Sequence, residues 1–249
     1  MKNHGRYNSK DNRIVKLQGY WSEIENQMIR FIERGHGLTE KARCAYAILL
    51  MMETGIRVGN ESSADGYICD NKYLPEYGKK IKTYGLTTLT IDHIKLTKNM
   101  LSLQFVGKKS VAQNLSTSHP ILLTYYSRIA SRQTSTLLDI NYRQLYSFVK
   151  KSIGKKFKPK DIRTVVVNNR FEENLRKVKG QLSTVSTKRD GKAILKLVIE
   201  KTAQQIGHTP GCCKSSYISK KFLGDVQDKI QKIIERNKKR NENRNYRIS

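Results

Sequence analysis

Acidic residues are scarce in this sequence. Its 249 residues include 21 Asp and Glu against 48 Lys and Arg, so the formal net charge is +27 at pH 7 and the pI is near 10.0. An excess of this size attracts a polyanion, for which nucleic acid is the first candidate and an anionic membrane surface the second. The length is sufficient to bury a core, as one large domain or two small ones.

Long apolar runs and cysteines are also few. No run reaches the roughly 18 residues of a transmembrane helix, and the first residues lack the apolar segment of a secretory signal. Cys44, Cys69, Cys212 and Cys213 are too scattered for a disulfide framework, and the adjacent pair does not have a zinc-ligand spacing. We therefore expect no structural metal and an intracellular, reducing compartment, whether bacterial, viral, nuclear or organellar.

The first third of the chain has helical periodicity after a polar start. Residues 1–16 are basic and lack periodicity, which predicts a flexible arm. Apolar residues recur at helical spacing in 21–32 and, more strongly, in 39–55, so the second of these helices is assigned to the core. Residues 61–86 are polar and rich in Gly, Tyr and Lys, and they predict a long functional loop.

Strand alternation then replaces helical spacing. The region of about 86–110 predicts a small antiparallel sheet with lysines at a hairpin tip. Helical spacing returns at 121–129 and 142–153. Pro159 is suited to the first turn of a further helix, although the three valines that follow it also fit a strand.

The C-terminal part completes the predicted organisation. Residues 179–192 are rich in Gly, Ser, Thr and Lys and predict a basic linker, and 222–249 predict a last helix with a basic tail. We therefore predict a mainly α fold with a small antiparallel β-sheet, in which 17–221 form one domain.

One stretch near the C-terminal end has a distinct chemical pattern. Apolar residues at helical spacing lead into 201–210, where Gly207 ends the helix and leaves His208 at its end. Tyr217 follows nine residues later in a small, polar run, which predicts a displayed phenol on a mobile segment. The pair is suited to an enzyme with a tyrosine nucleophile, although a helix-capping histidine and a surface tyrosine are commoner.

Three cations elsewhere are placed where they can contact a phosphate. Arg57 lies on an irregular turn between Gly55 and Gly59, directly after the core helix. Lys108 is expected at the hairpin tip, and Arg163 along the polar boundary of the helix that starts at Pro159. Each is also explained as an ordinary surface charge, so the order and spacing of the whole set decide the interpretation.

Taken in order, these motifs resemble the catalytic pentad of type IB DNA topoisomerases, most closely the small poxvirus and bacterial branch. They are Arg57 in Gly-Ile-Arg-Val-Gly-Asn, Lys108 in Phe-Val-Gly-Lys-Lys, Arg163 in Lys-Asp-Ile-Arg-Thr, His208 in Gly-His-Thr-Pro and Tyr217 in Lys-Ser-Ser-Tyr. The segment Tyr84-Gly85-Leu86-Thr87-Thr88-Leu89 and the turn Gly37-Leu38-Thr39 are also similar to that branch. The resemblance covers about residues 37 to 220 and implies the catalytic-core fold of DNA breaking-rejoining enzymes.

Tyrosine recombinases share that fold and most of the pentad. They usually have His-x-x-Arg where this chain has Lys160 and Arg163, and a further His or Trp shortly before the tyrosine's helix, so the resemblance favours a topoisomerase. Two departures stand out. Val165 and Val166 replace an aromatic and a small residue, and nothing before residue 20 can form the N-terminal β-rich domain of the small enzymes. Either the sequence is a catalytic domain, or its DNA clamp is built differently.

The pentad chemistry can be stated for each residue. Tyrosine has an unperturbed pKa of about 10, so its attack on a phosphodiester needs positive charge nearby. Arg57 and Arg163 are expected to donate to the non-bridging oxygens, and His208 to donate a hydrogen bond to the same oxygens. Lys108 is expected to protonate the departing 5′ oxygen, with Lys109 as the alternative.

Weaker predictions concern the surroundings of the pentad. Lys160 is a second candidate proton source, and Asn168 a candidate hydrogen-bond donor near the phosphate. Tyr84, Lys109 and Lys214 are predicted to contact DNA.

The expected activity is that of a monomeric type IB topoisomerase on double-stranded DNA, with Tyr217 forming a 3′-phosphotyrosyl intermediate. Strand swivelling would relax supercoils of either sign before religation. No carboxylate cluster, metal-ligand set or Gly-rich phosphate loop is found in the sequence, so no cofactor, Mg²⁺ or ATP is expected. The alternatives are a tyrosine recombinase and a non-enzymatic basic DNA-binding protein.

Overall fold

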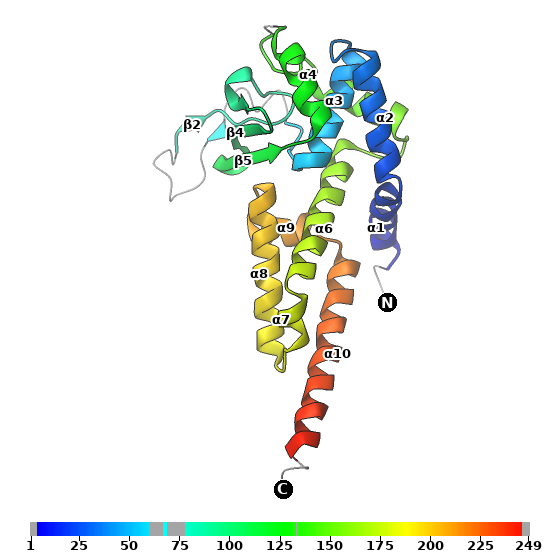
Figure 1. The fold of residues 1–249 in the computed structure, drawn as a ribbon, viewed down its shortest axis with the longest axis vertical. Helices are drawn as coiled ribbons and strands as arrows, with labels where there is room; N and C mark the ends of the chain where they lie inside the picture. Colours follow the sequence, from blue (N-terminus) through cyan, green and yellow to red (C-terminus); the bar gives the residue numbers. More distant parts are fainter. Residues whose placement is uncertain (1–3, 60–66, 69–77, 133, 246–249) are drawn as a thin grey trace. The chain divides into compact units, whose positions relative to one another are not determined.

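The computed structural model describes residues 4–59, 67–68, 78–132 and 134–245 (Figure 1). The chain divides into two compact units, Met1–Val166 and Val167–Ser249. The first unit contains helices and all the described strands, whereas the described secondary structure of the second is entirely helical. The predicted fold class, mainly α with a small antiparallel sheet, is confirmed.

Three helices open the first unit: α1 (His4–Gly19), α2 (Trp21–Arg34) and α3 (Glu40–Thr54). Helix α3 is the central helix of the core, because nearly all of its residues are buried. Helix α2 packs beside it (Figure 1). Thr39 caps α3, since its hydroxyl accepts from the Ala42 N–H at 3.2 Å.

The described strands form two antiparallel sheets. A two-stranded ladder joins β1 (Tyr67–Ile68) to β2 (Lys80–Ile81), and the larger sheet has the order β3 (Ile94–Leu96), β4 (Leu101–Gly107), β5 (Val111–Thr117). Leu101, Leu103 and Phe105 alternate inward along β4, which buries one face of the sheet against the core.

The rest of the first unit is helical. Helix α4 (Pro120–Ala130) and helix α5 (Tyr142–Ser152) both contribute to the core around α3. Helix α6 (Pro159–Lys177) starts in this unit and contains the boundary to the next one. The valines that also fitted a strand are therefore helical.

The second unit continues with α7 (Lys179–Ser183), α8 (Lys188–Ile206), α9 (Pro210–Ser216) and α10 (Lys220–Asn245). Helices α7, α8 and α10 contact one another, and α9 contacts α8 (Figure 1). A Cβ on Gly191 of α8 would lie 2.6 Å from Ile230 of α10, so this glycine permits the close packing of the two helices.

Two local predictions are wrong. Residues 4–19 are helical rather than a flexible arm, because Ile14 and Leu17 are buried in the core of the first unit. The predicted linker 179–192 is mostly the helix α7 and the start of α8, where Thr187 caps α8 by accepting from the Asp190 N–H at 3.1 Å.

Other boundaries differ in smaller ways. The sheet predicted at 86–110 spans 94–117, because 86–88 form a turn and a third strand follows the lysine tip. The last helix begins at Lys220. Most of the predicted loop 61–86 lies outside the described residues. In the described part of the chain, no helix combines the length and apolar character that crossing a membrane requires.

Candidate active site

Arg57 lies on the turn that follows α3. Gly55 ends this helix with a left-handed φ of 67°, and its N–H donates to the carbonyl of Met51. Ile56 is fully buried next to it, while the Arg57 side chain is half-buried. The turn therefore has a fixed backbone with one guanidinium at its edge, as the two framing glycines predict.

The Arg57 turn is joined to the Tyr84 segment through the backbone. The Leu86 N–H donates to the carbonyl of Arg57 at 2.8 Å, and the Thr87 N–H donates to the carbonyl of Val58 at 2.8 Å. Gly59 and Gly85 approach closely, since a Cβ on Gly85 would lie 2.6 Å from the Gly59 Cα. Two motifs that the sequence pattern singled out separately are therefore one structural element.

Tyr84 connects this element to the sheet. Its N–H donates to the carbonyl of Val106 in β4 at 2.8 Å, and its ring lies on the ring of His93 with centroids 4.0 Å apart. His93 in turn meets Phe105 edge-on at 6.3 Å, and burial lowers the pKa of His93. Tyr84 is half-buried in this stack, so only part of its side chain is exposed.

Lys108 lies in the short 3₁₀ turn η3 (Lys108–Ser110) between β4 and β5, and it is exposed. The ladder between these strands runs to the pair Gly107 and Val111, which places the turn at the end of a regular hairpin. The predicted lysine tip is thereby confirmed. The backbone of Lys109 lies in the same turn, but its side chain lies outside what the structure describes.

Lys160 and Arg163 lie in the first turns of α6 and differ in exposure. Lys160 is exposed, whereas Arg163 is 2% exposed. Thr164 donates its hydroxyl to the carbonyl of Lys160 at 3.0 Å, within the same helix. Arg163 was expected at a polar boundary and is instead buried, so its guanidinium is held in a defined environment rather than in solvent.

His208 follows the C-terminal cap of α8. Gly207 adopts a left-handed φ of 64°, and the His208 N–H donates back to the carbonyl of Ala203 at 2.8 Å. The expected place of His208 at a helix end is confirmed. Its ring lies 4.5 Å from the ring of Tyr217, centroid to centroid, at an angle of 32°.

Tyr217 differs from its prediction. The run before it forms α9, which Thr209 caps and Pro210 begins, so Tyr217 is the C-terminal cap of a helix rather than part of a mobile segment. Its side chain is 4% exposed, whereas a displayed phenol was expected. The reason is its contact with the imidazole of His208, together with the burial of the preceding Cys213.

Asn168 fixes the backbone around Tyr217. Its Nδ2 donates to the carbonyl of Tyr217 at 3.1 Å, and its Oδ1 accepts from the Ser219 N–H at 3.0 Å. Asn168 is buried, and the hydroxyl of Ser219 then accepts from the Phe222 N–H as α10 begins. The sequence pattern suggested a contact with phosphate, whereas these two hydrogen bonds are made to the backbone of Tyr217 and Ser219.

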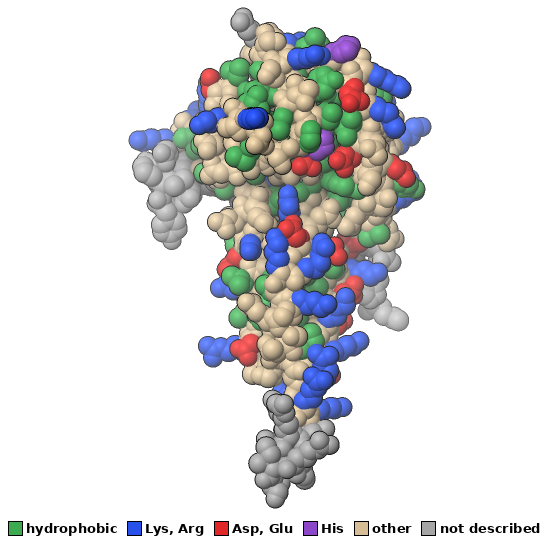
Figure 2. Space-filling model, in the orientation of Figure 1, with side chains coloured by type: hydrophobic (Ala, Val, Ile, Leu, Met, Phe, Trp, Pro, Cys, Tyr) green, Lys and Arg blue, Asp and Glu red, His purple; other side chains and the backbone are tan. Residues whose placement is uncertain are grey.

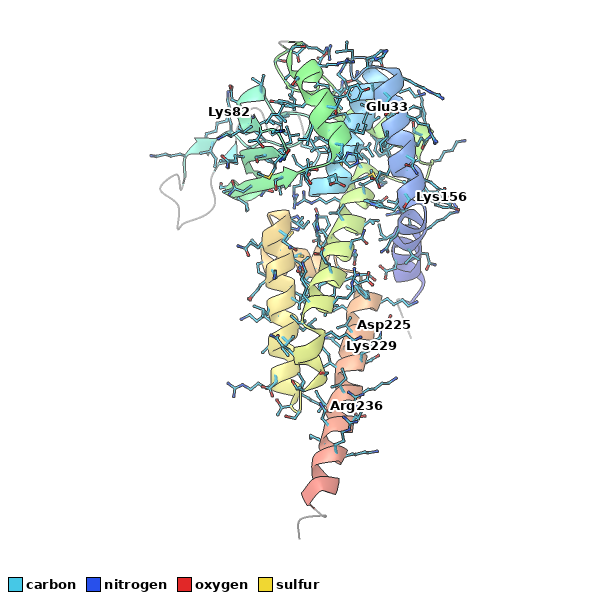
Figure 3. All side chains as sticks on the ribbon, in the orientation of Figure 1. Glu33, Lys82, Lys156, Asp225, Lys229 and Arg236 are labelled. Atoms are coloured by element: carbon cyan, nitrogen blue, oxygen red, sulfur yellow. The ribbon has the colours of Figure 1, made fainter. Side chains whose placement is uncertain are left out.

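Exposed cations lie on α9 and around the sheet. Lys214 of α9 is exposed, as expected for a DNA-contacting residue. On the face drawn in Figure 2, Lys and Arg side chains are numerous, and Figure 3 labels Lys82 next to β2 and Lys229 and Arg236 on α10. The exposed lysines of the sheet region are Lys79, Lys80, Lys82, Lys95, Lys98 and Lys108. Among the described residues, no three His, Cys, Asp or Glu side chains form a group that could hold a metal ion.

The first unit thus holds Arg57, Lys108 and Arg163, and the second holds His208 next to Tyr217. Chemically, the second group supplies a phenol with an adjacent imidazole on a rigid backbone. The first supplies two guanidiniums, which remain charged at any physiological pH, and one lysine, which can release a proton.

Comparisons with known proteins identify the family of this chain. A mainly helical core that carries, in chain order, three cations, a histidine and a tyrosine resembles that of enzymes that break and rejoin DNA through a tyrosine. Residues 3–244 match the family described as eukaryotic DNA topoisomerase I, catalytic core, and the chain therefore belongs to this family.

The chain is also similar to viral topoisomerases. It is 29% identical over 164 residues to DNA topoisomerase I of Monkeypox virus, a match that covers 62% of this chain and 48% of the relative. It is 28% identical over 164 residues to DNA topoisomerase 1B of Vaccinia virus (strain Copenhagen), with the same coverage of each chain. The match to DNA topoisomerase 1B of Acanthamoeba polyphaga mimivirus is 25% over 178 residues, covering 64% and 51%. The matched part is thus about half the length of these curated relatives.

Proposed function

We propose that this chain is a type IB DNA topoisomerase acting on double-stranded DNA as a monomer. The observation that carries the proposal is the placement of Tyr217 beside His208, on a backbone that Asn168 holds, in a chain of the topoisomerase I catalytic-core family. The large positive charge supports DNA as the substrate.

In this proposal the Tyr217 oxygen attacks a backbone phosphorus and forms a 3′-phosphotyrosyl bond, while the bond to the 5′ oxygen breaks. Arg57 and Arg163 stabilise the charge on the non-bridging oxygens of the transition state, and His208 donates to the same oxygens. Lys108 supplies the proton that the departing 5′ oxygen takes up, with Lys160 as a second source and Lys109 as the alternative to Lys108.

The reverse attack by the 5′ hydroxyl restores the strand. Because the phosphotyrosyl bond conserves the energy of the phosphodiester, resealing requires no ATP, and the proposed roles require no metal. Between the two steps the free end swivels about the intact strand, which relaxes supercoils of either sign. Tyr84, Lys109 and Lys214 are proposed as contacts that hold the duplex.

The test is single-turnover cleavage of a 5′-labelled duplex in EDTA, with the wild type beside Tyr217→Phe. The wild type is expected to form a covalent adduct through the 3′ phosphate, and peptide mapping should place it on Tyr217. The variant should still bind the duplex but form no adduct. Binding without adduct in the wild type would contradict the proposal and favour a non-enzymatic DNA-binding protein.

A recombinase remains the alternative enzyme. It would form the same adduct but would require a tetrameric synapse and a defined site. Adduct formation at low protein concentration on unrelated duplexes, from a species that sediments as a monomer, is the result expected for a topoisomerase.

A further inference from the structure

The N-terminal helix is ion-paired to the helix that carries Arg163. Nη2 of Arg13 in α1 donates to Oδ1 of Asp161 at 3.1 Å, and its Nε lies 3.1 Å from Oδ2. The two residues are 148 positions apart in the sequence, and both belong to the first unit. The pair therefore combines one charge-assisted hydrogen bond with a second close contact between opposite charges.

The carboxylate of this pair is buried. The Asp161 side chain is 5% exposed and that of Arg13 30% exposed, so solvent screens the pair less than it screens a surface ion pair. Removal of Arg13 would leave a buried charge without its cation, which is costly for the surrounding structure.

Asp161 also organises the start of α6. Its Oδ2 accepts from the Lys158 N–H at 3.0 Å, and its own N–H donates to the carbonyl of Lys158 at 2.9 Å. A carboxylate in the first turn that accepts from the residue before the helix satisfies one of the helix's unpaired donors. The direction of α6 at its first turn therefore depends on where the Asp161 carboxylate is held.

Arg13 is itself fixed in place. Ile14 and Leu17 of α1 are 4% and 0% exposed in the core of the first unit. The guanidinium of Arg13 is consequently presented from a packed helix and not from a loose N-terminal arm. Arg163 lies two residues after Asp161, with its own side chain 2% exposed.

We propose that Arg13 is a positioning residue for Arg163 and acts through the Asp161 carboxylate. The inference rests on the proposed function, in which Arg163 stabilises charge on the scissile phosphate. A displacement of about 1 Å at a catalytic group can reduce a rate by up to about a hundredfold, so a modest shift in the first turn of α6 is measurable.

The experiment compares two substrates on each protein preparation. One is the ordinary duplex, and the other has a methylphosphonate at the scissile position, which removes one of the negative charges that the arginines neutralise. A misplaced Arg163 slows cleavage of the charged phosphate more than cleavage of the methylphosphonate. The rate constant for the ordinary duplex divided by that for the methylphosphonate duplex, both from single turnovers, therefore reports on charge stabilisation. Partial unfolding reduces both rate constants equally and leaves this ratio unchanged.

Arg13→Ala is expected to lower this ratio by about tenfold, in the same direction as Arg163→Ala. Arg13→Lys should give an intermediate ratio, because the ammonium keeps the positive charge but lacks the planar geometry of the guanidinium. Lys16→Ala removes the same charge from an exposed position of α1 and should leave the ratio unchanged.

An unchanged ratio in Arg13→Ala would overturn the inference, even if the overall rate or the melting temperature fell. An equal fall in Lys16→Ala would also overturn it, because the effect would then belong to the net charge. If the wild type cleaved neither substrate, the proposed function itself would fail and the inference with it; cleavage of the ordinary duplex by the wild type separates the two cases.

Discussion

The backbone on either side of Tyr217 is held by one buried asparagine. Because Asn168 uses its donor on Tyr217 and its acceptor on Ser219, replacing it removes two hydrogen bonds and leaves a buried carbonyl and a half-buried N–H without these partners. This arrangement gives Asn168 a positioning role that sequence spacing alone did not show.

Asn168→Ala should slow single-turnover cleavage by about tenfold or more at saturating DNA, with little change in binding, because the nucleophile loses a fixed position. Asn168→Asp keeps the acceptor for Ser219 but cannot donate to Tyr217, so its rate should be intermediate. The measurement is the rate of adduct formation against protein concentration. A rate constant equal to that of the wild type in both variants would contradict the positioning role.

His93 gives a pH dependence with a definite sign. Burial lowers its pKa below the ordinary value of 6.5, and the Asp92 charge opposes this shift only in part. The unfolded chain therefore binds the proton at a higher pH than the folded chain, so stability falls as pH decreases through about 6.5. The fall in melting temperature from pH 7.5 to pH 5.5 should be smaller for His93→Gln than for the wild type. An equal fall in the two proteins would contradict this account.

At the scale of elements, the Arg57 turn and the Tyr84 segment depend on the absence of a side chain at Gly85. A Cβ there would lie 2.6 Å from backbone atoms of Gly59 and 3.0 Å from the carbonyl of Arg57, and backbone cannot rotate away as a side chain can. The hydrogen bonds of Leu86 and Thr87 to this turn would be strained together.

Gly85→Ala should therefore destabilise the protein by about 1–3 kcal/mol and reduce the cleavage rate. Gly19→Ala is the matched control, because a Cβ at Gly19 meets nothing within 4 Å. Gly85→Ala should lower both the melting temperature and the rate of single-turnover cleavage. Gly19→Ala should lower neither. Equal melting temperatures for Gly85→Ala and Gly19→Ala would contradict the proposed close approach.

Local sequence patterns were sufficient to predict some helices and helix ends of this protein. Periodicity located the core helix α3, and glycine at 55 and 207 predicted the helix ends next to Arg57 and His208, because these signals are local. The flexible-arm and linker predictions failed because 1–16 and 179–192 are polar in composition. A few apolar residues in or near these segments, such as Ile14 and Val185, are nevertheless buried. Burial of Tyr217 and the ion pair of Arg13 depend on contacts from distant residues, which a local pattern does not contain.

For the molecule as a whole, the formal charge of +27 predicts strongly salt-dependent binding. A protein that neutralises several phosphates releases their counterions, so the affinity for a duplex of arbitrary sequence should fall by about tenfold or more between 50 and 200 mM salt. Titration of a labelled duplex by fluorescence anisotropy at several salt concentrations gives the slope. A flat dependence would argue against the duplex backbone as the main binding partner.

The proposed activity can be measured as relaxation of supercoiled plasmid in EDTA without ATP, with the wild type beside Tyr217→Phe and an SDS quench to trap adducts. We predict that the wild type relaxes both positively and negatively supercoiled plasmid and leaves trapped 3′ adducts, and that the variant does neither. Adduct without relaxation would contradict the topoisomerase proposal in favour of a recombinase. Plasmid binding with neither adduct nor relaxation would contradict the enzymatic account altogether.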